Sequence, residues 1–252
     1  MKLPKECRQV SDSKGWLNCE YGIWYSEGER CLAAWSILCD FDGTISTGDV
    51  TDMLLEAFGK PGWQELEAEW RAGRIGSRVC MQQQIACLDA SKEELDEVID
   101  SIGVDEAFAV FVDAVSSHGW DLIIVSDGLD YAIERILKRH RLPVLPFYAN
   151  RLRQAGARSW KLDSPYADAA CCAASGMCKC AFARRVRATG NKVLMIGDGR
   201  SDFCVAGCAD LVFAKGSLIT HCCDKYLPHV PISGFDDAVH MIPALLEPAS
   251  VI

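Results

Sequence analysis

The sequence of 252 residues lacks an apolar run long enough to cross a bilayer. Its longest early run, residues 31–39, falls well short of the roughly 20 residues that a spanning helix needs, and it leads straight into acidic residues. No basic start followed by an apolar stretch opens the chain, so we expect no secretory signal. Basic residues are also few: 26 Lys and Arg against 35 Asp and Glu give a net charge of -9. This balance argues against a nucleic-acid or anionic-membrane partner and suits a carboxylate-rich metal site.

Cysteine, by contrast, is abundant, with 14 residues. Because no secretory signal is apparent, we expect reduced thiols and a cytoplasmic protein. Half of the residues are apolar, which is enough to bury the core of one domain of ordinary size or of one that carries an inserted subdomain. We find no internal repeat.

Apolar runs alternate with amphipathic segments along most of the chain. Strands are predicted for residues 35–41, 121–125, 192–196 and 211–214, and less clearly for 144–148, where prolines interrupt. Helices are predicted for residues 129–139 and 179–188. This alternation predicts an α/β fold with a doubly wound, parallel, Rossmann-like sheet, whose ligands bind beyond the carboxyl ends of the strands.

Two segments fall outside this alternation. Residues 1–34 are polar and rich in glycine, and we interpret them as an N-terminal extension. Residues 49–113 have helical periodicity and are predicted to form an inserted helical cap, so the catalytic core comprises residues 35–48 and 114–252. The helices of the cap are predicted at residues 49–58, 63–72, 77–88 and 92–102.

Three predicted strands end in small polar or acidic residues, at positions 40–44, 126–128 and 197–202. Asp40 and Asp42 point to the same side of an extended strand, and with Asp198 they provide the hard oxygen ligands that Mg²⁺ prefers. Asp40 can then attack phosphorus, while Asp42 protonates the leaving group and activates water. The alternatives are an ordinary Asp-Gly turn, or a calcium loop, whose spaced acidic series is missing.

Further residues complete a candidate phosphate site. Ser126 and the backbone N–H groups after it, starting at Asp127, can hold a phosphate oxygen at a helix start, or Ser126 can simply cap that helix. Lys179 supplies a point positive charge, unless it is a solvated surface lysine. Asp202 can orient Lys179 or a metal-bound water, and can also cap the next helix.

Together these residues resemble the haloacid dehalogenase superfamily, whose four motifs fall here in order. The resemblance covers residues 35 to about 235, and the helical insert after the first motif resembles the cap of phosphoserine-phosphatase-like members. It implies Asp40 as nucleophile, Asp42 as acid and base, and Mg²⁺ held by Asp40, Asp198 and the Asp42 carbonyl. The phosphate ligands that it implies are Ser126 and Lys179, and we expect Gly43, Thr44 and Asp127 to bind the phosphate beside them.

A closer resemblance is to the methionine-salvage phosphatases that act on 2-hydroxy-3-keto-5-methylthiopentenyl-1-phosphate. It rests on residues 125–130, on the cysteine-rich stretch that ends at residues 178–180, and on residues 74–78 of the cap. The sequence departs from that pattern in two places. Asp127 stands where glycine is usual, and the extension of 34 residues is not expected.

Substrate selection should fall to the cap, because the cap closes over the pocket. Arg74 and Arg78 would lie one helical turn apart on a continuous helix and clamp an anion or a hydroxyl, or they form a solvated basic face. Asp49, Asp52 and Glu56 share a face of the first cap helix. They can bind an amine or a hydroxyl, or face solvent.

Four cysteines, at positions 171, 172, 178 and 180, fall within ten residues and are a candidate zinc site. Against this, the spacings of Cys171 with Cys172 and of Cys178 with Cys180 are not those of zinc knuckles, and cysteine also packs as a small apolar residue. We interpret the later cysteines, at positions 204, 208, 222 and 223, as core residues.

The most direct function is a Mg²⁺-dependent phosphomonoesterase that hydrolyses a small phosphorylated metabolite through an aspartyl-phosphate intermediate. Phosphoserine or another small phosphate ester is the alternative substrate, and a phosphotransferase would share the intermediate. A non-catalytic binding module is disfavoured because the nucleophile and the lysine are both retained, and dehalogenation because it does not need Asp42. The sequence leaves the oligomeric state open.

Overall fold

The computed structural model describes residues 16–18, 24–26 and 34–246, and the chain forms two compact units, residues 1–34 and 35–252. In the first unit, β1 (Trp16–Asn18) pairs antiparallel with β2 (Trp24–Ser26). Sequence analysis did not predict this pair, because three residues are too few to show a strand's alternation. The rest of the predicted extension lies outside the described residues.

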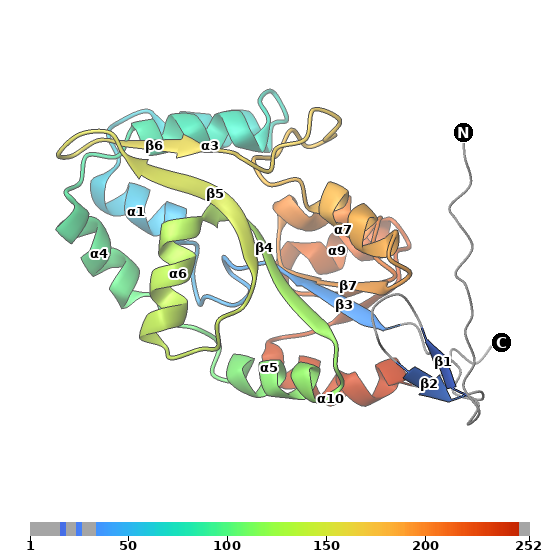
Figure 1. The fold of residues 1–252 in the computed structure, drawn as a ribbon. Coiled ribbons are helices and arrows are strands. Elements are labelled where there is room, and N and C mark those ends of the chain that lie inside the picture. The colour runs from blue at the N-terminus through green and yellow to red at the C-terminus, as the bar shows by residue number, and fades with distance from the viewer. Residues whose placement is uncertain (1–15, 19–23, 27–33, 247–252) are drawn as a thin grey trace. The chain divides into compact units, whose positions relative to one another are not determined.

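The second unit is built on a sheet of seven strands (Figure 1). The strands are β3 (Trp35–Cys39), β4 (Asp121–Leu129), β5 (Phe147–Gln154), β6 (Trp160–Asp163), β7 (Lys192–Gly197), β8 (Leu211–Ala214) and β9 (His229–Pro231). Their order is β6-β5-β4-β3-β7-β8-β9, and every neighbouring pair is parallel except β5 and β6. The predicted α/β fold with a mostly parallel sheet is confirmed.

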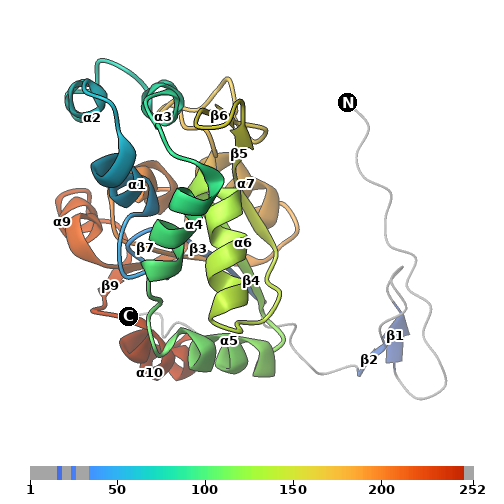
Figure 2. The ribbon, with the colours of Figure 1, turned by 90° about the vertical axis from the view of Figure 1, so that its left-hand side faces the viewer.

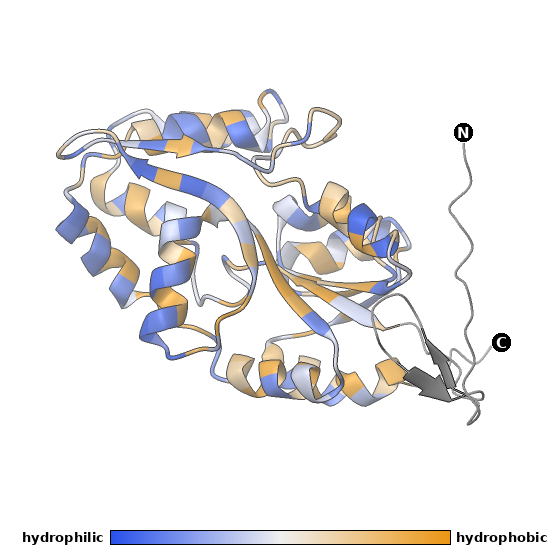
Figure 3. Ribbon diagram, viewed as in Figure 1, coloured by the Kyte–Doolittle hydropathy of each residue, from blue (hydrophilic) through white to orange (hydrophobic). Residues whose placement is uncertain are grey.

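Besides the predicted cap helices, the described part of this unit contains six α-helices and a short 3-10 helix, η1 (Arg200–Asp202). The six α-helices are α5 (Phe108–Ser117), α6 (Asp130–Arg139), α7 (Lys179–Arg187), α8 (Phe203–Ala206), α9 (Gly216–Asp224) and α10 (Phe235–Leu246). They cover both faces of the sheet. Along β3, Ile37 and Cys39 belong to a core shared with α5, α6 and α10, whereas Leu38 belongs to a second core shared with α7, α8 and α9. Apolar residues therefore fill the central strands, as Figure 3 shows, because both faces of a doubly wound sheet are buried.

The predicted strand at residues 144–148 is displaced. The observed β5 begins at Phe147, directly after Pro146. Proline has no N–H to donate to a sheet, and Pro146 contributes only its carbonyl, which accepts from the Ile124 N–H at 2.9 Å. The short antiparallel strand β6, which sequence analysis did not predict, extends the sheet on that side.

Four helices follow β3 within residues 49–113: α1 (Val50–Phe58), α2 (Trp63–Arg71), α3 (Ser77–Ala86) and α4 (Lys92–Ser101). Asp49 caps α1 by accepting a hydrogen bond from the Asp52 N–H, and Ser91 and Glu94 form a capping box at α4. Figure 2 shows α3 between α2 and β6, and α3 packs on both of them. By contrast, α5 packs against strand β4 and helix α10.

No helix among the described residues is long and apolar enough to cross a membrane.

Candidate active site

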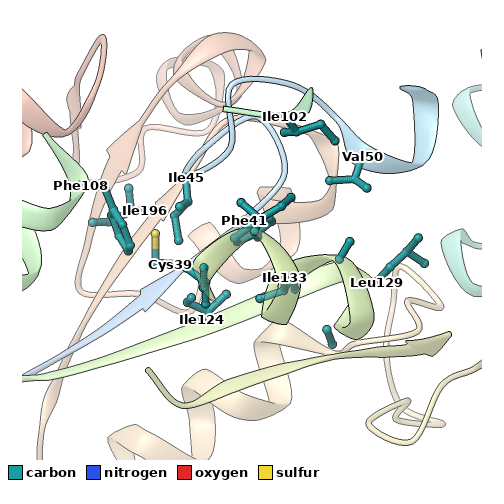
Figure 4. Close-up of a cluster of buried hydrophobic side chains, with 14 of the residues drawn as sticks. Cys39, Phe41, Ile45, Val50, Ile102, Phe108, Ile124, Leu129, Ile133 and Ile196 are labelled. Carbon is teal, nitrogen blue, oxygen red and sulfur yellow. The ribbon is translucent and has the colours of Figure 1, made fainter. Parts of the chain in front are cut away.

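Asp40 lies directly after the buried strand β3, at the carboxyl edge of the sheet. Its Oδ1 accepts a hydrogen bond from the Phe41 N–H at 2.7 Å, which fixes the carboxylate. Phe41 packs into the apolar core with Ile124 and Ile196 of the neighbouring strands (Figure 4). Asp40 itself is 4% exposed, so the strand presents one carboxylate to a nearly closed space.

Lys179 reaches this carboxylate from the first turn of α7. Its Nζ lies 2.8 Å from Asp40 Oδ2 and 2.6 Å from Asp202 Oδ1, and it also donates to the Ser201 hydroxyl at 3.2 Å. Burial alone would lower the pKa of Lys179, but the charges of Asp202 and Asp40 raise it above its ordinary value. Lys179 is therefore buried and paired with two carboxylates, and it is not a surface lysine.

Asp198 approaches Asp40 from the end of β7, and carboxylate oxygens of Asp40, Asp198 and Asp202 lie within 4.8 Å of one another. Burial and then the charge of Asp40 raise the pKa of Asp198 to about 6. Thr44 donates to Asp198 at 3.2 Å. Crowded carboxylates of this kind favour a bound cation, and their hard oxygens suit a divalent metal.

Asp202 serves mainly as the partner of Lys179. It is fully buried, and its second oxygen accepts from the backbone N–H groups of Asp198 and Gly199 at 3.2 and 3.4 Å. Both oxygens are thus engaged. The structure places Asp202 behind the lysine, where sequence analysis expected it to act.

Glycine is required at two positions around these carboxylates. Gly43 has a φ of +70°, and a Cβ there would lie 2.7 Å from Asp198 Oδ2. At Gly128 a Cβ would lie 2.1 Å from Asp42 Oδ2. These glycines let the first two motif loops close around Asp42 and Asp198.

Asp42 stands on the pocket side of Asp40. One oxygen accepts from the Val50 N–H at 3.0 Å, and the other faces the Ser126 hydroxyl at 3.4 Å. Burial, and then the charge of Asp49, raise the pKa of Asp42 well above its ordinary value. A raised pKa suits a carboxyl group that must hold a proton near neutral pH before donating it.

Ser126 does not cap a helix. Strand β4 continues to Leu129, and α6 begins only at Asp130 with Leu129 at its N-cap position. Between Val125 and Leu129 the register with β5 shifts, so residues 126–128 bulge out of the ladder at the edge of the site. The alternative that Ser126 caps the helix is therefore wrong, whereas its role as a phosphate ligand stays a prediction, and the bulge positions its hydroxyl.

The side chain of Asp127 turns to the protein, not to the phosphate space. Its Oδ1 accepts from the Met177 N–H at 2.9 Å and from Asn150 Nδ2 at 3.1 Å, and its Oδ2 accepts from the Ser77 hydroxyl. The carboxylate thus joins β4 to β5, to the loop before α7 and to α3. Only the backbone of Asp127 is left to act as a phosphate ligand.

A pocket opens from these motif residues toward the helical insert. Three carboxylates line it there, those of Asp49, Asp52 and Glu67, together with the soft side chains of Cys80 and Met81. Burial and the charge of Asp52 raise the pKa of Asp49 to about 6, and burial and the charge of Glu67 raise that of Asp52. The pocket wall is therefore acidic, with an apolar section beside it.

The other cap candidates lie elsewhere. Arg74 precedes α3 and pairs with Glu69 through two hydrogen bonds of 2.6 and 2.7 Å, so the two arginines do not share a continuous helix. Arg78 and Glu56 are exposed, and neither lines the pocket. The structure does not bring these three residues to the site.

No three of the four cysteines proposed for zinc lie close enough together to hold a metal. Among the described residues, the acidic group of Asp40, Asp198 and Asp202 is the only set of three or more potential ligands close enough to hold a metal. Cys180 instead touches Cys204, with the two Sγ atoms 2.9 Å apart. The zinc hypothesis has no support in this geometry.

Sequence analysis missed three residues of the site. Ser201 donates to Asp40 Oδ2 at 3.2 Å, and Lys215 donates to the carbonyls of Gly43 and Thr44 at 3.1 and 3.4 Å. Arg200 lines the pocket and lies 5.6 Å over the ring of Trp70 in α2, a cation–π contact between the core and the helical insert. Ser201 and Arg200 sit within the third motif stretch, which could have flagged them, whereas nothing local marks Lys215.

The fold and the site define a class of protein. One edge of a doubly wound sheet carries an oriented aspartate, a buried lysine and a cluster of carboxylates that suits a divalent cation. These are the groups that a phosphate monoester hydrolase needs. Residues 37–207 match the haloacid dehalogenase-like hydrolases, and the chain belongs to this family. It is a phosphatase of that family, as sequence analysis predicted.

Curated relatives and solved structures agree with this placement. A 2-hydroxy-3-keto-5-methylthiopentenyl-1-phosphate phosphatase of Exiguobacterium sp. (strain AT1b) is 31% identical over 80% of this chain and 94% of its own length. The protein of the same name from Brevibacillus brevis is 28% identical over 82% and 94%. A phosphoserine phosphatase solved as a phospho-aspartyl intermediate analogue superposes with a TM-score of 0.64 at 18% identity, covering 83% of this chain and 99% of that one. That last likeness concerns the fold.

Proposed function

We propose that this phosphatase hydrolyses a small phosphorylated metabolite through an aspartyl-phosphate intermediate on Asp40. The observation that carries the proposal is the position of Asp40 Oδ2, which lies 2.8 Å from Lys179 Nζ and 3.2 Å from the Ser201 hydroxyl. Two donors that hold one carboxylate oxygen leave the group oriented for attack on phosphorus. The same lysine then neutralises charge on the phosphoryl oxygens.

Asp42 acts as the acid and then as the base. Its raised pKa keeps the proton that the leaving alkoxide needs, and after departure of the alcohol the carboxylate can take a proton from water. This second role favours hydrolysis over transfer to another acceptor. Ser126, Gly43, Thr44 and the backbone of Asp127 surround the phosphoryl group.

The residues present fit a divalent cation, and we assign Mg²⁺. Asp40, Asp198 and the main-chain carbonyl of Asp42 would hold it, since Asp202 is committed to Lys179. When bound, Mg²⁺ neutralises the negative charges of the nucleophile and the phosphate as they approach. Thr44 keeps Asp198 aimed at this position.

The leading candidate substrate is 2-hydroxy-3-keto-5-methylthiopentenyl-1-phosphate, after which the curated relatives are named. Cys80 and Met81 on the pocket wall offer soft, apolar contacts that suit a methylthio group. Such a wall needs no charge on the organic part of the substrate.

A second candidate is a phosphomonoester that carries an ammonium group, with phosphoserine as the simplest case. The favouring observation is the acidic section of the wall, formed by Asp49, Asp52 and Glu67. Arg200 also lines the pocket and could pair with a substrate carboxylate.

The test is hydrolysis of an aryl phosphate, followed by a panel that contains both candidate substrates. Asp40→Asn should lower kcat by roughly 10³-fold or more, as loss of a nucleophile does. Asp113→Asn, an exposed change on α5, is the matched control and should leave kcat unchanged. An Asp40→Asn protein that folds and retains full activity would exclude the proposed nucleophile.

A further inference from the structure

Two thiols touch directly behind the lysine of the active site. Cys180 follows Lys179 in the first turn of α7, and Cys204 lies in α8, two residues after Asp202. Their Sγ atoms are 2.9 Å apart, and both cysteines are free. The thiol contact and the ion pair between Lys179 and Asp202 therefore link the same two segments of chain.

The two thiols differ in their access to solvent. Cys180 is 5% exposed, whereas Cys204 is half-buried. The exposed Cys172 lies near Cys204, and Cys204 is the main cause of the raised pKa of the Cys172 thiol. A small oxidant can thus reach Cys204 first, and the buried Cys180 is already in contact with it.

We propose that Cys180 and Cys204 form a reversible disulfide that switches the phosphatase off when a peroxide oxidises the protein. The formation of the bond depends on the thiol geometry alone. The effect on activity rests on the proposed function, because it acts through Lys179.

The chemistry balances with hydrogen peroxide as the oxidant. The Cys204 thiolate attacks one peroxide oxygen, the O–O bond breaks, and the released hydroxide takes up a proton as water, which leaves a sulfenic acid. The Cys180 sulfur then attacks the Cys204 sulfur, the S–O bond breaks, and the hydroxyl group leaves as water with the Cys180 proton. Two thiols are oxidised by two electrons, and one peroxide is reduced to two waters.

Bond formation pulls the start of α7 and α8 toward each other. An S–S bond is about 2.05 Å long, so the two sulfurs must approach by roughly 0.9 Å from their present 2.9 Å. Cys180 is bonded directly to Lys179, whose Nζ holds Asp40 and Asp202 at 2.8 and 2.6 Å. A displacement of about 1 Å in a catalytic group can cost on the order of 100-fold in rate.

Peptide mapping tests the bond itself. The reduced full-length protein is treated with hydrogen peroxide, blocked with an alkylating agent and digested with trypsin, which cuts after Lys179, Arg184, Arg200 and Lys215. We expect residues 180–184 to be linked to residues 201–215 through Cys204. A bond from Cys204 to Cys172, or no bond at all, overturns the proposal.

Activity on an aryl phosphate tests the switch. We expect at least a tenfold loss after peroxide, recovery after dithiothreitol, and no loss in Cys204→Ser. Cys208→Ser, four residues further on in the same tryptic peptide, is the matched control and should stay sensitive. Full activity of the mapped disulfide form, or sensitivity of Cys204→Ser, refutes the switch. A reduced protein without phosphatase activity would instead refute the proposed function, while the mapping result would stand.

Discussion

Replacing Asp127 by alanine should destabilise the protein by about 3 kcal/mol. The carboxylate is 7% exposed and accepts three hydrogen bonds, from Ser77, Asn150 and the Met177 N–H. A net hydrogen bond to a charged group contributes about 1.5–3 kcal/mol, and a buried donor left unpaired costs about 1–3 kcal/mol. In Asp127→Ala, Asn150 keeps its hydrogen bond to the backbone carbonyl of residue 127, and the Ser77 hydroxyl can rotate to another partner. The Met177 N–H is therefore the buried donor that is left unpaired.

Urea unfolding followed by circular dichroism measures this change, and thermal unfolding should show a Tm lowered by roughly 6–12 °C for a chain of this size. Asp127→Asn keeps the volume and one acceptor oxygen, so it should lose about half as much. Ser77→Ala removes only the bond to α3 and should cost about 1 kcal/mol. If Asp127→Ala unfolds within about 0.5 kcal/mol of the unchanged protein, the polar cluster contributes no stability and the reasoning fails.

Three further predictions concern the site. Asp202→Asn leaves Lys179 buried with one fewer charge partner, so urea unfolding should show a loss of about 3–5 kcal/mol, and a loss below 1 kcal/mol would contradict it. Asp49 has a pKa raised to about 6, so its carboxyl group is ionised above that pH and neutral below it. The KM for phosphoserine should therefore rise as the pH falls from 7 to 5, and Asp49→Asn should flatten this pH profile of KM. If Asp49→Asn leaves the profile unchanged, Asp49 does not bind the amine. Treatment with a chelator should abolish hydrolysis of an aryl phosphate, and added Mg²⁺ should restore it. The Asp198→Asn variant should need at least about tenfold more Mg²⁺ for half-maximal activity. If both proteins need the same Mg²⁺ concentration, Asp198 is not a ligand.

The periodicity of the sequence located most elements well. The four helices after β3 start and end within two residues of their predicted bounds, because a capping residue or a glycine marks the start of each. Strand β8 was predicted with its observed bounds, Leu211–Ala214. Several elements were missed. The strands β1, β2, β6 and β9 have only three or four residues, and Pro146 delays β5; for these, local preference is weak and pairing with a distant strand decides the outcome. The longer helices α5, α9 and α10 were not predicted either.

The site shows the same division. That Asp40, Ser126 and Asp198 would meet followed from the sequence, because parallel strands bring their carboxyl ends to one edge. The sequence could not show that β4 runs on past Ser126 and places it by a bulge, since register depends on the neighbouring strand.

The sequence by itself determined the class of fold, the order of the motifs and the set of candidate reacting groups, because these depend on local apolar patterns and on the chemistry of side chains. Only the tertiary structure decided which partners those groups have. Asp127 bonds to Ser77 across 50 residues, and Cys180 meets Cys204 across 24. Such contacts are made when helices and loops pack, and packing depends on the shapes of many side chains at once, which no local stretch of sequence encodes.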